Sequence, residues 1–391
     1  MSKVSLSPWP SFTQEEADAV QKVLLSNKVN YWTGQEGREF EKGFAKFADC
    51  EYAIAVSNGT TALDLALKGL GIRAGDEVIV TSRTFIASIS SIVTAGATPV
   101  FADVDRDSQN ISPETIEAVI TDKTKAIICV HLAGWPCEMD GIMALAEKHA
   151  LKVIEDCAQA HGARYKGKSV GSIGHVGAWS FCQDKIMTTG GEGGMVTTND
   201  KNLWNFMWSY KDHGKSYDAV YNREHPPGFR WLHESFGTNW RLTEMQSAIG
   251  RIQLTRMAEW TRVRNEHAGK LVKVCRNFPC IRVPNVPDYI EHANYKFYVF
   301  VELDQLADGW TRDKIVNTLN ELGVPAMQGS CSEVYLEKAF DNTPFQPKES
   351  LPMAKELGET SLMLLIHPTI TSEQMDAVAS HLTDVLTQAT K

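Results

Sequence analysis

The chain has 391 residues, of which 43% are hydrophobic and 22% are charged, and its formal net charge is −9 at pH 7. A length of this order suggests about two or three domains, with cores large enough to exclude water from a deep site. The acidic balance, without any run rich in Lys and Arg, argues against a nucleic-acid partner.

The eight cysteines form no C-x-x-C pair and no metal-type spacing, so we predict neither disulfides nor a metal centre. The first ten residues lack the apolar core of a signal peptide, and apolar runs long enough for a membrane helix, about 18 residues, do not occur. We therefore expect a cytoplasmic protein with no membrane partner.

Secondary structure is predicted from the first residues onward. Thr13 and Glu16 form a capping-box pattern, which predicts an N-terminal helix over 13–25. Short apolar runs then alternate with helical patterns. The predicted strands cover 53–57, 77–81, 98–104, 126–131, 152–156, 178–181 and 194–198. This alternation indicates an α/β fold with a mostly parallel seven-stranded sheet, covered by helices on both faces.

A long helical pattern starts at Thr243 and runs to about residue 273, after which the pattern changes. One strand and two helices are predicted beyond it, at 295–303, 311–322 and 372–386. We predict a large α/β domain over 1–255 and a smaller α+β domain over 256–391. The N-terminal helix is expected to pack on the smaller domain.

Ligands of such sheets bind beyond the carboxyl ends of the strands, and two charged residues lie there. Asp156 ends one predicted strand, where a carboxylate is costly unless it is paired or hydrogen-bonded. A helix cap or a loop anchor is the alternative for this residue. Lys185 follows the next strand and precedes a glycine-dense stretch at 188–194. Lysine is ordinarily a solvated surface residue, but imine chemistry needs a desolvated one.

Two further features follow the first two strands. Ser57, Asn58, Gly59 and Thr60 lie between a strand and a helix, where free N–H groups form an anion site. Ordinary N-capping by Ser57 or Thr60 is the alternative. Phe85 follows the next strand, and a core aromatic is its default interpretation.

Together these features match the needs of one cofactor, pyridoxal phosphate (PLP). Its phosphate requires N–H donors and its ring requires a stacking face. Its pyridine nitrogen requires a carboxylate that keeps it protonated, and its aldehyde requires a lysine. A helix start, an aromatic ring, a buried acid and a strand-end lysine at one sheet edge therefore predict a PLP site.

The motifs at 56–63, 155–162, 180–194 and 237–243 resemble those of the DegT/DnrJ/StrS group of sugar aminotransferases, which have the aspartate-aminotransferase fold (fold type I). The resemblance covers nearly the whole chain. It implies a PLP-dependent aminotransferase that moves an amino group from an amino acid, with glutamate expected, to a keto- or aldehydo-sugar. Amino-sugar biosynthesis for cell-surface polysaccharides is the expected context.

The resemblance also implies roles for individual residues. Lys185 is the Schiff-base lysine and shuttles a proton between substrate and cofactor. Asp156 pairs with the pyridine nitrogen and Gln159 with the ring hydroxyl. Phe85 stacks on the ring.

The phosphate contacts are implied in the same way. Gly59, Thr60 and Ser180 hold the phosphate, and Asn239 reaches it from the neighbouring subunit. The resemblance therefore implies a homodimer with shared active sites.

The chain departs from the family pattern at two positions of the cofactor site and over residues 323–332, which lack the histidine-containing stretch common in relatives that act on nucleotide-linked hexoses. Cys182 replaces a common histidine, and we expect this substitution to affect packing only. Asn58 replaces a serine and keeps hydrogen-bonding capacity. Some relatives carry histidine in place of the lysine and act as dehydratases. Lys185 argues against a PLP-dependent dehydratase or lyase, which remains the rival activity.

One segment, 210–231, is a candidate to bind the acceptor sugar, because it is rich in cations and aromatics. Lys211, Lys215 and Arg230 are candidates to bind a sugar-acid carboxylate or a phosphate. The segment looks most like that of enzymes that aminate the C8 of an oxidised 3-deoxy-octulosonate. A nucleotide-linked keto-hexose is the alternative acceptor, and a solvated or dimer-interface loop is the alternative role of the segment.

Overall fold

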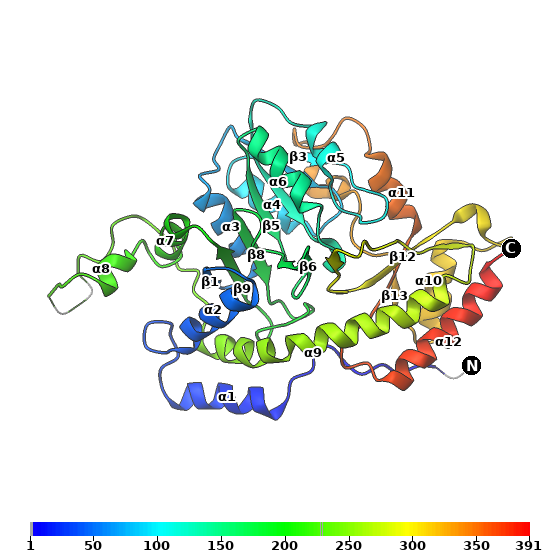
Figure 1. Cartoon of the computed structure of the whole chain (residues 1–391), viewed down its shortest axis with the longest axis horizontal. Coiled ribbons are helices and arrows are strands. Elements are labelled where there is room, and N and C mark those ends of the chain that lie inside the picture. The colour runs from blue at the N-terminus through cyan, green and yellow to red at the C-terminus, as the bar shows by residue number, and fades with distance from the viewer. Residues whose placement is uncertain (1–2, 227, 229) are drawn as a thin grey trace.

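The computed structural model describes residues 3–226, 228 and 230–391 (Figure 1). The described helices are α1 (Gln14–Leu25), α2 (Glu36–Phe47), α3 (Gly59–Gly69), α4 (Ala87–Thr94), α5 (Pro113–Glu117), α6 (Met139–Lys148), α7 (Lys201–Tyr210), α8 (Tyr217–Tyr221), α9 (Glu244–Cys275), α10 (Arg312–Glu321), α11 (Pro352–Thr360) and α12 (Ser372–Ala389). Short 3-10 turns cover Leu132–Gly134, Leu303–Gln305, Val334–Leu336 and Lys338–Phe340.

The strands form three sheets. They are β1 (Tyr52–Val56), β2 (Glu77–Thr81), β3 (Thr98–Ala102), β4 (Thr124–Val130), β5 (Lys152–Asp156), β6 (Arg164–Tyr165), β7 (Lys168–Ser169), β8 (Val176–Ser180), β9 (Gly194–Thr198), β10 (Ile281–Arg282), β11 (Ile290–Glu291), β12 (Phe297–Val301), β13 (Ala326–Met327) and β14 (Ser361–Leu364). The predicted fold class is confirmed, because the largest sheet has seven strands in the order β1-β9-β8-β5-β4-β2-β3. Pairing is antiparallel on both sides of β9 and parallel between the other neighbours.

Both faces of this sheet are buried, as near-continuous apolar strands require. Along β2, Val78 and Val80 belong to the core under α3 and α4, while Ile79 between them belongs to the core under α5 and α6. The alternation follows from the two-residue period of a strand. Since β1, β2, β5 and β8 run in the same direction, their carboxyl ends meet at one edge, and the chain that follows each strand is brought together there.

The predicted long helix is confirmed as α9, which runs from beside the seven-stranded sheet to the four-stranded sheet (Figure 1). The second sheet has the order β10-β12-β14-β13 and is antiparallel throughout. Its core includes Leu271 of α9, Ile315 of α10 and Leu382 of α12. In the part of the chain that the structure describes, no helix is both long enough and apolar enough to span a membrane.

The N-terminal helix is confirmed as α1, and it packs along α9. Glu16 accepts hydrogen bonds from Gln253 and Arg256, which lie on either side of the domain boundary predicted at 255/256. The segment before α1 instead contacts the chain around the four-stranded sheet, where the Val4 N–H donates to the Leu322 carbonyl. The division into two domains stays a prediction.

Candidate active site

A cavity of about 760 Å³ opens at the carboxyl edge of the seven-stranded sheet. It is lined by seven of the eight cofactor residues expected from the sequence: Gly59, Thr60, Phe85, Asp156, Gln159, Ser180 and Lys185. Asp156 and Ser180 end β5 and β8, and the others come from the segments that follow β1, β2, β5 and β8. The strand-end rule therefore brings together residues that are up to 126 positions apart in the chain.

One end of the cavity is suited to an anion. Asn58 caps α3, and its side chain accepts a hydrogen bond from the Thr61 N–H over 2.9 Å. The N–H groups of Gly59 and Thr60 then point out of the first turn, without an acceptor among the described residues. A Cβ at Gly59 would lie 2.6 Å from the Ser180 Cβ, so only glycine lets the helix start approach that hydroxyl.

A carboxylate lies in the floor of the cavity. Asp156 is 5% exposed, and burial raises the pKa of its carboxyl above the ordinary value. One carboxylate oxygen accepts from the Ser88 hydroxyl over 2.8 Å, and the other accepts from the Ala158 N–H over 3.1 Å. Both bonds favour the ionised form, as does the nearby Lys185. The carboxylate is therefore held in place for a cationic partner within the cavity.

The aromatic and amide groups lie beside this carboxylate. Phe85 is 69% exposed, so its ring forms cavity wall and is not the core aromatic that is the default expectation. Gln159 accepts a hydrogen bond from the Ala133 N–H over 2.8 Å, which fixes its amide oxygen. Its amide NH₂ is left available to a ligand in the cavity.

Lys185 reaches into the cavity from the loop after β8. Its ammonium lies 3.5 Å from an Asp184 oxygen, and the side chain is 17% exposed. The Tyr295 hydroxyl donates to the other oxygen of Asp184 over 2.6 Å. Although burial opposes ionisation of Asp184, Lys185 and this hydroxyl lower the pKa of its carboxyl. Asp184 is thus an anion that faces the Lys185 ammonium.

The donor set fits PLP on structural grounds. Free N–H groups at the start of α3 and the Ser180 hydroxyl suit a phosphate. The buried Asp156 suits a protonated ring nitrogen, since a cation would stabilise its ionised form. An exposed aromatic face and a shielded lysine line the same cavity.

Several residues of this region were not predicted from the sequence. Trp9 donates from its indole N–H to the Lys185 carbonyl over 2.9 Å. Ser88 holds Asp156, Tyr295 holds Asp184, and Lys296 lines the cavity. The strand-end rule could have indicated Ser88, which follows β2. The other three come from distant parts of the chain.

Asn239 is the one expected cofactor residue that does not line this cavity. It is exposed and forms an isolated β-bridge with Asp212. The two described departures from the family pattern lie at the cavity, because Asn58 and Cys182 both line it. Asn58 keeps its hydrogen-bonding capacity as the α3 cap.

The structure corrects the expectation for segment 210–231, of which Pro227 and Phe229 lie outside the described residues. Lys211 is fully buried and lies 3.3 Å from the Glu41 carboxylate. Lys215 is 7% exposed and lies 3.2 Å from Asp212. Both ammonium groups are buried and paired with carboxylates of the fold, although Lys215 shares Asp212 with Arg241. The expectation that these two lysines hold an anionic acceptor is therefore wrong. The sequence could not show their acidic partners.

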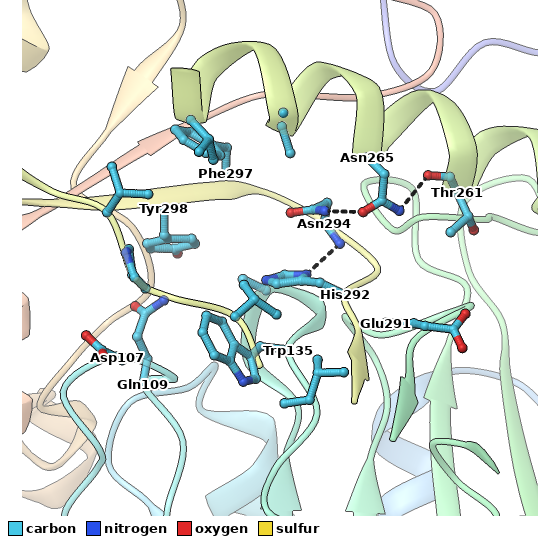
Figure 2. Close-up of a pocket in the computed structure, with 18 residues that line it drawn as sticks. Asp107, Gln109, Trp135, Thr261, Asn265, Glu291, His292, Asn294, Phe297 and Tyr298 are labelled. Atoms are coloured by element: carbon cyan, nitrogen blue, oxygen red, sulfur yellow. Dashed lines mark hydrogen bonds between the residues drawn. The ribbon is translucent and has the colours of Figure 1, made fainter. Parts of the chain in front are cut away.

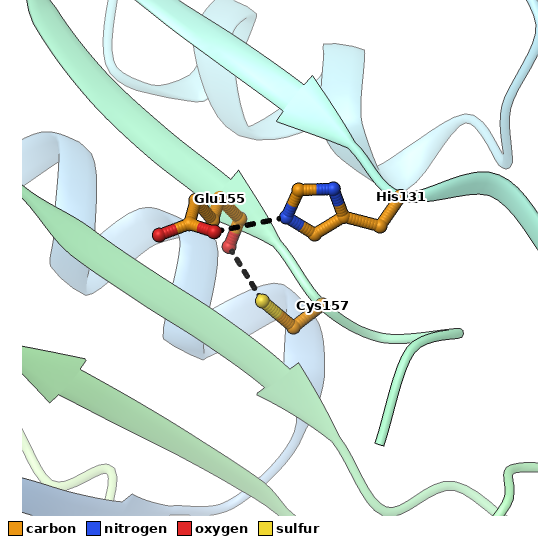
Figure 3. A group of neighbouring side chains, drawn as sticks. All are labelled: His131, Glu155 and Cys157. Atoms are coloured by element: carbon orange, nitrogen blue, oxygen red, sulfur yellow. Dashed lines mark hydrogen bonds and ion pairs between the residues drawn. The ribbon is translucent and has the colours of Figure 1, made fainter. Parts of the chain in front are cut away.

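A buried group of His131, Glu155 and Cys157 lies close enough to hold a metal ion (Figure 3). The carboxylate, however, accepts four hydrogen bonds, from His131 and from the N–H groups of residues 171, 173 and 174. The other ring nitrogen of His131 accepts from the Cys137 N–H over 3.0 Å. Burial raises the pKa of the Cys157 thiol, so the thiolate that would bind a metal is disfavoured. Glu155, which His131 holds in place, therefore anchors the 171–174 turn.

A second cavity, of about 470 Å³, lies between α9, residues 283–298 and a wall that contains Asp107, Gln109 and Trp135 (Figure 2). Its described lining contains no lysine, and Tyr298 is a wall residue of both cavities. Some of its polar side chains bond to each other. The Asn294 amide donates to Asn265 over 2.8 Å, and Asn265 donates to the Thr261 carbonyl over 2.9 Å. Lysine chemistry is therefore available in the first cavity and not from the described lining of the second.

Comparison with known proteins agrees with this geometry. The model of the DegT/DnrJ/EryC1/StrS aminotransferase family matches residues 10–383. The crystal structure of an aminotransferase from Psychrobacter cryohalolentis is 64% identical, with a TM-score of 0.96, and the match covers 98% of this chain and 99% of that one. GDP-perosamine synthase of Caulobacter vibrioides is 38% identical over 91% of this chain and 92% of its own length.

A third relative is the dTDP-3-amino-3,6-dideoxy-alpha-D-galactopyranose transaminase of Aneurinibacillus thermoaerophilus, which is 36% identical over 94% of each chain. The family match and these identities extend over both large sheets and α9. The chain belongs to the DegT/DnrJ/EryC1/StrS aminotransferase family and is a PLP-dependent aminotransferase.

Proposed function

We propose that this enzyme transfers an amino group from L-glutamate to a keto- or aldehydo-sugar. The observation that carries the proposal is the cavity that Lys185 lines together with the buried Asp156 and the start of α3. The relatives support the sugar acceptor, because two of them are named for amino sugars. Glutamate as the donor rests on the expectation from the sequence.

Each cavity residue has a role in this proposal. When bound, PLP supplies an electron sink for the bonds at the reacting carbon. Asp156 keeps the ring nitrogen protonated, and Gln159 contacts the ring hydroxyl. Lys185 bonds to the cofactor and moves a proton at the reacting carbon.

The remaining residues hold the cofactor. Phe85 covers one face of the ring, while Gly59, Thr60 and Ser180 bind the phosphate. Asn239 completes the phosphate site of a neighbouring subunit, so the functional unit is a homodimer. The exposed position of Asn239 and the exposed aromatics Trp231 (81%) and Phe236 (98%) of the segment before it support this role.

The preferred acceptor is a nucleotide-linked keto-hexose, since the names of both relatives contain a nucleoside diphosphate sugar. An 8-oxo-3-deoxy-octulosonate is the second candidate, favoured by the resemblance of segment 210–231 to enzymes of that class. Calorimetry separates the two acceptors. Tight binding of a uridine or thymidine diphosphate sugar contradicts the eight-carbon acid.

The amino transfer is tested by incubating the PLP-loaded enzyme with L-glutamate alone. We expect the cofactor to convert to its pyridoxamine form with release of one equivalent of 2-oxoglutarate. The Lys185→Ala variant is the control, and it should not complete the conversion. If the wild-type enzyme leaves the cofactor unchanged but eliminates water from a sugar without any amino donor, the rival dehydratase activity replaces this proposal.

A further inference from the structure

Lys296 is a second lysine of the catalytic cavity, and the steps described above do not use it. It directly precedes β12, so it reaches the cavity from the four-stranded sheet and not from the sheet that carries Lys185. Ser330, from the chain between β13 and β14, lines the cavity on the same side, where its N–H donates to the Tyr298 hydroxyl over 2.9 Å. Lys296 thus enters the cavity from the second sheet, and its ammonium and that of Lys185 lie over the same Tyr295 ring, 4.7 and 5.5 Å from its centre.

The ammonium of Lys296 has no ion-pair partner among the Asp and Glu side chains of the described residues. Among the described residues, its ammonium makes a cation–π contact with Tyr295, 4.7 Å from the centre of the ring. Asp184 is the acid whose charge raises the pKa of Lys296, but its carboxylate is already paired with Lys185 and accepts a hydrogen bond from the Tyr295 hydroxyl. The positive charge of Lys296 is therefore not neutralised by the fold.

Holding such a charge in a shielded position is unfavourable. Burial lowers the pKa of Lys296 to about 8, Asp184 partly offsets this effect, and Arg264 and Lys185 add to it. Lysines elsewhere in the fold differ, because Lys211 and Lys215 are buried beside carboxylates. A cation kept in a reaction cavity without an acid is instead suited to an anion that arrives from solution.

We propose that Lys296 binds a carboxylate or phosphate oxygen of the substrate while the substrate reacts at Lys185. This inference rests on the proposed amino transfer, in which both the donor and the acceptor carry such a group. It is separate from the phosphate site of the cofactor, which lies at the start of α3. The same cation can serve both substrates, since they occupy the cavity one after the other.

The test compares Lys296→Met, which removes the charge at similar volume, with Lys296→Arg, which keeps it. Lys314→Met is the matched control, because Lys314 also lies over an aromatic ring (Trp310, 4.5 Å) but does not line the cavity. We expect Lys296→Met to raise the KM of at least one substrate by about ten- to a hundredfold, with a smaller change in kcat. Lys296→Arg should recover most of the loss, and Lys314→Met should be unchanged.

Binding measurements on the PLP-loaded enzyme identify the group that is bound. Glutarate serves as the probe for the donor carboxylates, and uridine diphosphate serves as the probe for a nucleotide-linked acceptor. Weaker glutarate binding in Lys296→Met assigns the lysine to the donor, and weaker diphosphate binding assigns it to the acceptor. Because no amino transfer is needed, these measurements still test Lys296 if glutamate fails to convert the cofactor.

The pH profile supplies a readout that a purely structural lysine would not change. When the pH is below the Lys296 pKa of about 8, the side chain is a charged ammonium that binds anions. When the pH is above this value, the neutral amine does not bind them. We therefore expect kcat/KM of the wild-type enzyme to fall above this pH and the fall to be weaker in Lys296→Arg. If Lys296→Met keeps both KM values and both probe affinities, the proposal is overturned.

Discussion

The indole N–H of Trp9 donates a hydrogen bond to the main-chain carbonyl of Lys185 over 2.9 Å. The Trp9 ring itself is held edge-on against Trp260, at 5.1 Å, and stacked on His367, at 5.9 Å. The N-terminal segment therefore fixes the backbone of the lysine that is expected to bond to the cofactor. This contact links the region of the four-stranded sheet to the catalytic edge of the seven-stranded sheet.

Trp9→Phe should reduce kcat by about three- to tenfold, because it removes a single hydrogen bond but keeps an aromatic ring. Trp260→Phe is the control, since it alters the same aromatic cluster without touching Lys185. Steady-state kinetics at saturating cofactor compare the two variants. Equal losses in both would mean that packing, and not the bond to Lys185, explains the effect.

Asp156→Asn should lower turnover by about a hundredfold or more, because the amide cannot keep the ring nitrogen protonated. Thermal stability should be unchanged or slightly higher, since burial already raises the pKa of this carboxyl and disfavours its charge. Ser88→Ala, which removes only the 2.8 Å hydrogen bond to Asp156, should lose much less activity. Near-normal turnover of Asp156→Asn would refute the role of the carboxylate.

Lys211→Met should destabilise the fold by about 3–5 kcal/mol, because it leaves the buried Glu41 without its cation. Glu41 would keep its hydrogen bonds from Tyr31 and Ala55 but not its charge partner. Urea unfolding measures the loss, and the double variant with Glu41→Gln should recover part of it. A stable variant with a raised acceptor KM would instead restore the substrate-binding role that was expected from the sequence.

The sheet and most of the cofactor site could be predicted from the sequence for a physical reason. Buried parallel strands are near-continuous apolar runs, and their carboxyl ends gather at one edge, so Asp156, Ser180 and Lys185 could be placed together. Trp9 and Lys296 could not, because their positions depend on how the N-terminal segment and the four-stranded sheet pack against that edge. The burial of Lys211 depends on Glu41, which is 170 positions away.

Asn239 tests whether two subunits share each site. Asn239→Asp should weaken cofactor binding in the partner's site by charge repulsion, and Lys185→Ala disables the site of its own subunit. Random mixing of the two variants gives about half heterodimers, each with one intact site, so about a quarter of the wild-type activity should return. The separate variants should show almost none. If mass analysis confirms heterodimers and the mixture stays inactive, Asn239 does not act across the interface.

The identity of the lysine that bonds to the cofactor is the central claim, and among the described residues Lys185 and Lys296 are the two lysines that line the cavity. The charge of Lys185 lowers the pKa of the buried Asp156, whereas the pKa of Lys296 is influenced by the charges of Asp184, Arg264 and Lys185. Borohydride reduction of the PLP-loaded enzyme, followed by proteolysis and mass spectrometry, locates the bonded lysine directly. We predict that the peptide containing Lys185 carries the added pyridoxyl mass, and the same mass on Lys296 or on any other lysine would contradict this account.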